Sequence, residues 1–179
     1  MLVLLPPEPT FAELEAAGAT IETHGEAHPV AGLLAGSGEI ARVTGYETGL
    51  DGHHSIRGDT CEPDPLILDE RFLAAHVRGR GVTVLSACSH AGVVNACLGA
   101  AELTDQPVDL ILGGYHLAGG TAEQRIAATV ADLRDRIGPR IVAPGHCTGW
   151  RAKAALADAF APGRYGPSVV GTRYHLTAE

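Results

Sequence analysis

The stretch VTVLSACSHAGVVNAC, residues 82–97, changes character in its middle. Its first half is a short apolar run, as in a buried strand, and the run stops at His90. From Gly92 onward the apolar residues are spaced as in a helix. A strand that ends near an imidazole and leads into a helix is typical of layered α/β folds. The stretch therefore predicts that His90 lies just beyond the carboxyl end of a strand.

The same pattern occurs twice more, in DLILGGYH ending at His116 and in RIVAPGH ending at His146. The spacings between the histidines, 26 and 30 residues, leave room for a helix between successive strands. In layered α/β folds, ligands collect beyond the carboxyl ends of strands. A single histidine in this context is more often a core or surface residue, so the repetition carries the inference. Because neutral imidazole binds zinc, iron and manganese, the pattern predicts a metal cluster of His90, His116 and His146.

Hydrophobic periodicity predicts the remaining elements. A helix over 10–18 begins with a capping box of Thr10 and Glu13, and a helix over 121–138 begins with one of Thr121 and Gln124. The second helix carries an apolar stripe of Ile126, Val130, Leu133 and Ile137. Further helices are expected at 92–103 and 149–160, strands at 19–24, 38–49, 66–77, 81–88, 108–114, 140–144 and 168–176, and a long loop at 49–65.

Composition limits the classes of function. With 179 residues, 45% apolar and 19% charged, the chain is expected to form a single domain, residues 1–179, with a packed core. A net charge of −8 and no Lys/Arg cluster argue against nucleic acid and anionic membrane as partners. The opening MLVLLPPEP lacks a basic region and is too short for a signal peptide or a membrane span. Four cysteines without a C-x-x-C pair favour reduced thiols and a cytoplasmic protein.

Around the three histidines the sequence resembles the metallo-β-lactamase fold superfamily, in its branch of dihydropterin ribofuranosyl-aminobenzene-phosphate synthase-like metallohydrolases. The resemblance rests on DPLILDERFLAAHV, ACSHAGVVN, LGGYHL and PGHCTGWRA, and extends from about residue 37 to residue 176. It implies that His90 binds a first metal and His146 a second, while His116 stands where the superfamily usually has a bridging Asp or Cys. It further implies one or two divalent metal ions, with zinc favoured over manganese or iron. The implied reaction is attack of a metal-bound hydroxide on an ester or phosphoester.

The sequence departs from the superfamily in one respect. The motif H-x-H-x-D-H, which supplies most metal ligands there, does not occur, since His24 and His28 are four residues apart and no Asp-His pair follows. We therefore expect an α/β fold that is a partial metallo-β-lactamase αββα sandwich, its C-terminal portion, truncated so that the N-terminal strands are missing. With ligands lost, the isolated chain is expected to bind metal weakly and to be weakly active or inactive.

A homodimer or a separate N-terminal polypeptide would restore the site. The alternative is a catalytically silent domain that acts by binding or association, which leaves open whether the chain is an enzyme.

Other polar residues are candidates for contacting a small-molecule substrate, phosphorylated or not. His53 and His54 lie on the expected long loop and are as readily a solvated pair. Ser89 and Asn95 flank one expected helix start, and Thr148 lies at another. Free backbone N–H groups at a helix start can bind anions. Ordinary helix capping also explains Thr148 and Ser89.

The cysteines next to the predicted ligands have a different interpretation. Cys88 is expected to be a small buried packing residue, and Cys147 either supports His146 or replaces a ligand. A cysteine-dependent enzyme is a third and weaker hypothesis, because sequence adjacency does not place a thiol beside a base.

Overall fold

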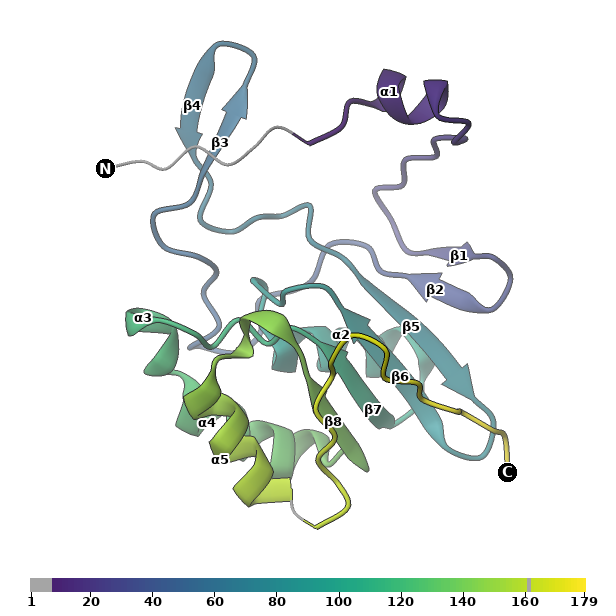
Figure 1. Cartoon of the computed structure of the whole chain (residues 1–179), viewed down its shortest axis with the longest axis vertical. Coiled ribbons are helices and arrows are strands. Elements are labelled where there is room, and N and C mark those ends of the chain that lie inside the picture. The colour runs from purple at the N-terminus through teal and green to yellow at the C-terminus, as the bar shows by residue number, and fades with distance from the viewer. Residues whose placement is uncertain (1–7, 161) are drawn as a thin grey trace.

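The computed structural model describes residues 8–160 and 162–179, so most of the apolar opening segment lies outside the described residues. Its main sheet has the strand order β1-β2-β5-β6-β7-β8 (Figure 1). The strands are β1 (His28–Val30), β2 (Leu34–Gly36), β5 (Phe72–Val77), β6 (Gly81–Ser86), β7 (Val108–Gly113) and β8 (Ile141–Pro144). The pairs from β1 to β6 are antiparallel, whereas β6, β7 and β8 are parallel. Together with the helices, this confirms the predicted α/β class.

The helices build the core against one face of this sheet. Helix α2 (Val93–Thr104) packs on β5, β6 and β7, α5 (Trp150–Phe160) packs on β8, and α4 (Ile126–Asp132) contacts both helices. Because strand residues alternate in direction, Val82 and Val84 enter this core while Leu85 faces the other side. Burying such side chains stabilises the fold by about 1.5–3 kcal/mol each. No helix in residues 8–160 and 162–179 combines the length and hydropathy needed to cross a bilayer.

The register of the parallel strands brings their carboxyl ends to one edge. Ser86 at the end of β6 pairs with Gly113 at the end of β7, and Gly113 pairs with Pro144 at the end of β8. The predicted succession of three strands ending together is therefore present, and the chain leaves the sheet three times at the same rim.

Two predicted strands in the first half, 19–24 and 38–49, are absent, and the prediction was wrong there. Side chains, not strand pairing, hold residues 38–49. The Oδ1 atom of Asn95 accepts hydrogen bonds from the backbone of Val43 and Thr44, and Glu47 accepts from the backbone of Val94 and Asn95. Glu47 thereby caps the start of α2, whose own N-cap residue is a glycine without a side chain.

Other elements also differ from expectation. The expected loop 49–65 contains a hairpin of β3 (His54–Arg57) and β4 (Thr60–Pro63) that projects away from the main sheet (Figure 1). The expected strand 66–77 is shorter at its start, since β5 begins at Phe72. The expected strand 168–176 is wrong, since the C-terminal segment forms no strand there and Glu179 donates to the carbonyl of Arg78.

The helix predicted over 121–138 is divided. Helix α3 (Gly120–Glu123) is separated from α4 by a tight turn with i→i+3 hydrogen bonds, and a π-helical turn follows over Leu133–Ile137. The predicted capping box of Thr121 and Gln124 is wrong, because the N-cap of α3 is Gly119, two residues before Thr121. Its apolar stripe packs in the core as predicted, and α1 (Phe11–Ala16) has the predicted capping box of Thr10 and Glu13.

Candidate metal centre

His90 and His116 lie together at the rim where β6 and β7 end. Their ring centroids are 4.5 Å apart and the rings meet edge to face. The Nδ1 atom of His116 is buried and has no hydrogen-bond partner among the described residues. Burial, with a smaller contribution from the charges of His90 and Arg125, lowers the pKa of His116. A neutral imidazole with an unsatisfied buried nitrogen is the state that binds a metal ion.

Glu70 holds His90 and is a residue that the sequence reasoning missed. Its Oε1 atom lies 3.1 Å from Nδ1 of His90, and the carboxylate also accepts hydrogen bonds from the backbone N–H groups of His90 and Ala91. Although burial acts in the opposite direction, these hydrogen bonds hold the pKa of Glu70 below its usual value. A detectable signal existed: an antiparallel hairpin returns the start of β5 to the end of β6, where Phe72 pairs with Ser86.

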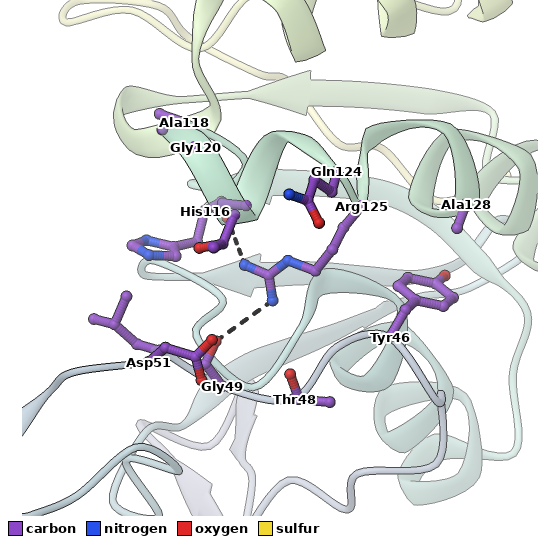
Figure 2. Close-up of a pocket in the computed structure, with 14 residues that line it drawn as sticks. Tyr46, Thr48, Gly49, Asp51, His116, Ala118, Gly120, Gln124, Arg125 and Ala128 are labelled. Carbon is purple, nitrogen blue, oxygen red and sulfur yellow. Dashed lines mark hydrogen bonds between the residues drawn. The ribbon is translucent and has the colours of Figure 1, made fainter.

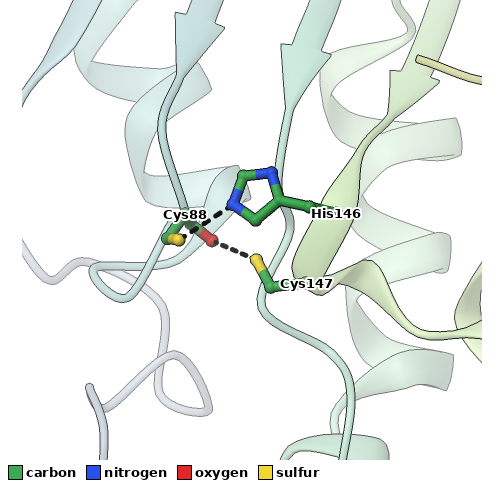
Figure 3. A group of neighbouring side chains, drawn as sticks. All are labelled: Cys88, His146 and Cys147. Atoms are coloured by element: carbon green, nitrogen blue, oxygen red, sulfur yellow. Dashed lines mark hydrogen bonds between the residues drawn. The ribbon is translucent and has the colours of Figure 1, made fainter. Parts of the chain in front are cut away.

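His146 lies with two thiols, from Cys88 and Cys147 (Figure 3). The Nε2 atom of His146 is 3.0 Å from Sγ of Cys88, and one donor atom from each residue falls within 4.8 Å of the others. Cys147 also donates from Sγ to the carbonyl of Cys88, at 3.3 Å. Gly114 makes this packing feasible, because a Cβ there would lie 2.5 Å from Sγ of Cys147 and 3.0 Å from Cε1 of His146. Thiol and imidazole are the donors that zinc-like ions prefer, so these residues fit a divalent metal ion.

The expectation for Cys88 requires correction. We predicted a small buried packing residue, but its side chain is only half-buried and its thiol faces His146. Burial and the neighbouring thiol of Cys147 raise the pKa of Cys88 to about 11. In the metal-free protein this thiol is therefore protonated at neutral pH, which argues against the cysteine-nucleophile hypothesis.

A pocket of about 540 Å³ opens beside His116 (Figure 2). Its wall includes Tyr46 and Asp51 from the first half of the chain and Arg125 from the turn between α3 and α4. The guanidinium of Arg125 donates to the carbonyls of His116 at 3.2 Å and Gly49 at 3.5 Å. Its Nε atom is buried and has no partner in the described part of the chain. Sequence reasoning missed Arg125, because nothing in the helical pattern marks it as facing a pocket.

The residues predicted to contact substrate are placed differently. Ser89 is buried and donates to the carbonyl of Gly114, and the hydroxyl of buried Thr148 accepts from the backbone of Tyr115. Asn95 is also buried, with its amide used within the chain as described above. His53 and His54 lie at the base of the β3–β4 hairpin and bond to nearby backbone carbonyls. None of these five residues lines the pocket beside His116.

Comparisons with known proteins give one partial curated relative and a solved structure of the same fold. No protein-family model matches the chain. A curated relative from Methanocaldococcus jannaschii, "7,8-dihydropterin-6-methyl-4-(beta-D-ribofuranosyl)-aminobenzene-5'-phosphate synthase", is 31% identical over 94 residues, which cover 52% of this chain. The match spans about a third of that relative's length (31%).

A solved structure gives the broader likeness. Tm1679, described as a metal-dependent hydrolase of the beta-lactamase superfamily, superposes with a TM-score of 0.74 at 23% identity. The superposition covers 88% of this chain and 58% of Tm1679. The sheet order, the strand-end histidines and this likeness agree with the resemblance seen in the sequence. The chain therefore has the fold of the metal-dependent hydrolases of the β-lactamase superfamily.

Proposed function

We propose that the protein is a metal-dependent hydrolase that cleaves an ester or phosphoester bond in a small molecule. The observation that carries this proposal is that His90, His116 and His146 each follow a strand that ends at the same sheet rim, where a pocket of about 540 Å³ is lined by His116. In layered α/β folds this rim is where ligands bind. The likeness to a metal-dependent hydrolase supports the same class of reaction.

In this proposal the three imidazoles hold one or two divalent metal ions. When bound, such an ion lowers the pKa of a water molecule and polarises the bond that is cleaved. Glu70 accepts the Nδ1 proton of His90 and so leaves the Nε2 lone pair of that ring for the metal. His116 contributes its Nδ1 atom, which has no hydrogen-bond partner among the residues that the structure describes.

The pocket supports a small-molecule substrate that carries a negative charge, as a phosphorylated compound does. The Arg125 side chain brings a permanent positive charge to the pocket wall next to His116. Asp51 lies on the wall and contributes a negative charge, so we place the anionic group of the substrate at the Arg125 end.

The test is hydrolysis by the reduced full chain after metal removal and reloading. We expect p-nitrophenyl acetate or bis(p-nitrophenyl) phosphate to be cleaved after zinc or manganese is added, and the rate to fall on chelation. His90→Ala and His116→Ala should abolish the metal-dependent rate, whereas His175→Ala, at an exposed position, should not. A folded, metal-loaded protein that cleaves neither ester would contradict the proposal and favour the catalytically silent alternative.

The same preparation tests the predicted partners. We expected a second copy of the chain or a separate polypeptide to add metal ligands. If this holds, metal content per chain should rise with the fraction of dimer, or on addition of the other polypeptide, in size-exclusion experiments.

A further inference from the structure

We propose that Cys88 and Cys147 are metal ligands, and that with His146 they form a Cys₂His zinc site built entirely from this chain. This inference deepens the proposed function and rests on its metal-binding rim. It does not depend on hydrolysis. The sequence reasoning left Cys147 as either a support for His146 or a replacement ligand and treated Cys88 as a packing residue, so a site in which both thiols bind the metal goes beyond it.

The geometry of the three donors is close to that of a coordination shell. Zinc binds sulfur at about 2.3 Å and imidazole nitrogen at about 2.0–2.1 Å, so tetrahedral donors are about 3.5–4 Å apart. In the structure one donor atom from each residue lies within 4.8 Å of the others, and Sγ of Cys88 lies 3.0 Å from Nε2 of His146. Side-chain adjustments of up to about 1 Å would bring these donors to tetrahedral spacing around an ion.

The backbone places these donors from two separate segments. Cys88 follows β6, whereas His146 and Cys147 begin the 3-10 turn His146–Thr148 after β8. The strand between them, β7, continues into Gly114, which has no side chain at the point where the imidazole and the Cys147 thiol meet. Figure 3 shows the three side chains converging from both sides of this strand end.

The other two cysteines show what non-ligating positions look like in this chain. Cys97 is fully buried in the core on α2, and Cys61 is exposed on the β3–β4 hairpin. Cys88 and Cys147 are half-buried at the rim, and each thiol is within reach of a second donor. Ordinary packing explains the first pair of cysteines, but it does not explain two thiols and an imidazole meeting at one point.

Such a site changes the expectation for metal affinity. Three protein ligands with one open position form the usual arrangement of catalytic zinc, and Cys₂His is one of its known ligand sets. A complete set in this chain means that zinc binding does not require H-x-H-x-D-H ligands. Thiolate donors also favour zinc over manganese, because manganese prefers oxygen ligands.

Cobalt(II) titration of the reduced full chain tests the proposal, because thiolate ligation gives a ligand-to-metal charge-transfer band in the near ultraviolet. We expect this band to appear and to be displaced by zinc. Cys88→Ser and Cys147→Ser should each weaken the band and reduce cobalt affinity by more than about 100-fold, since losing a direct ligand exceeds the loss of a supporting residue. Cys61→Ser and Cys97→Ala are the matched controls and should leave both unchanged.

A second measurement needs no variant. Zinc should protect Cys88 and Cys147, but not Cys61, from alkylation in the wild-type protein, as mapped by mass spectrometry. Cobalt binding without the charge-transfer band, or equal alkylation with and without zinc, would overturn the inference while leaving the proposed hydrolase intact. A charge-transfer band without ester hydrolysis would support the inference and contradict the proposed function.

Discussion

Oε1 of Glu70 lies 3.1 Å from Nδ1 of His90, and the same carboxylate accepts two backbone N–H groups, from His90 and Ala91. The buried carboxylate thus fixes both the ring and the backbone of one candidate ligand. A carboxylate that accepts the Nδ1 proton of a histidine sets the tautomer and increases the basicity of Nε2. The distance places Glu70 in the role of a residue that orients His90.

Replacing Glu70 with Gln should reduce metal affinity about 10- to 100-fold while the protein stays folded. Gln keeps the shape but loses the charge, and its amide hydrogens oppose the N–H donors of His90 and Ala91. Isothermal titration with zinc measures the affinity, and circular dichroism checks the fold. Glu39→Gln, at an exposed position, is the control. Unchanged zinc affinity in Glu70→Gln would show that Glu70 does not support metal binding through His90.

The strand-end histidines were predictable because their signal is local. An apolar run followed within a few residues by a histidine specifies both the strand and the edge at which the side chain emerges. The parallel register of β6, β7 and β8 then aligns the three strand ends. Glu70 was missed because the sequence reasoning did not follow the hairpin of β5 and β6, which returns the start of β5 to the end of β6, near His90.

The misassigned segment 38–49 shows where periodicity fails. Its alternating residues resemble a strand, but the backbone N–H groups of Val43 and Thr44 are bound by the side chain of Asn95, more than 50 residues away in sequence. A contact with the buried start of α2 outweighs local strand preference. Asn95 and Glu47 are therefore explained by the helix start that they stabilise, which only tertiary structure could show.

Gly114→Ala should weaken zinc binding by about tenfold or more, because it disturbs both candidate ligands at once. The added Cβ would lie 2.5 Å from Sγ of Cys147 and 2.9 Å from the carbonyl oxygen of Ala87, so the thiol and the backbone must shift. We also expect unfolding free energy to fall by about 1–3 kcal/mol, as for other overpacked sites. Zinc titration and urea unfolding measure the two effects.

Gly120→Ala is the matched control for this change, since no heavy atom lies within 4 Å of a Cβ at that position. Wild-type zinc affinity in Gly114→Ala would mean that Cys147 and His146 need not occupy their observed positions to bind metal.

Asp109 should make stability depend on acidic pH. The Arg140 guanidinium, which donates two hydrogen bonds to this buried carboxylate at 2.8 and 3.0 Å, holds the pKa of Asp109 below its ordinary value of 3.8. The stabilisation is therefore fully present above pH 3.8 and is lost as the pH falls through the lower pKa of the folded protein. Asp109→Asn should lower the free energy of unfolding by about 1 kcal/mol at neutral pH. In this variant the free energy of unfolding should also fall less steeply as the pH is lowered.

Urea unfolding at a series of pH values checks this prediction. Asp135→Asn removes the exposed pair with Arg134 and should change stability little, because solvent screens such pairs. If the free energy of unfolding fell equally with pH in wild type and in Asp109→Asn, the proposed role of the Asp109–Arg140 pair would be ruled out.

Arg125→Gln should discriminate between charged and neutral substrates. Arg125 brings its positive charge to the pocket beside His116, so removing it should raise KM for an anionic ester by about tenfold, equivalent to about 1.4 kcal/mol. KM for a neutral ester of similar size should change little, and Arg125→Lys, which keeps the charge, should recover part of the difference. Steady-state kinetics on the metal-loaded protein measure both values, with Arg151→Gln, whose side chain pairs with Glu123 at the surface, as the control. An equal loss of activity on both esters would assign Arg125 a structural role instead, through its hydrogen bonds to the carbonyls of His116 and Gly49.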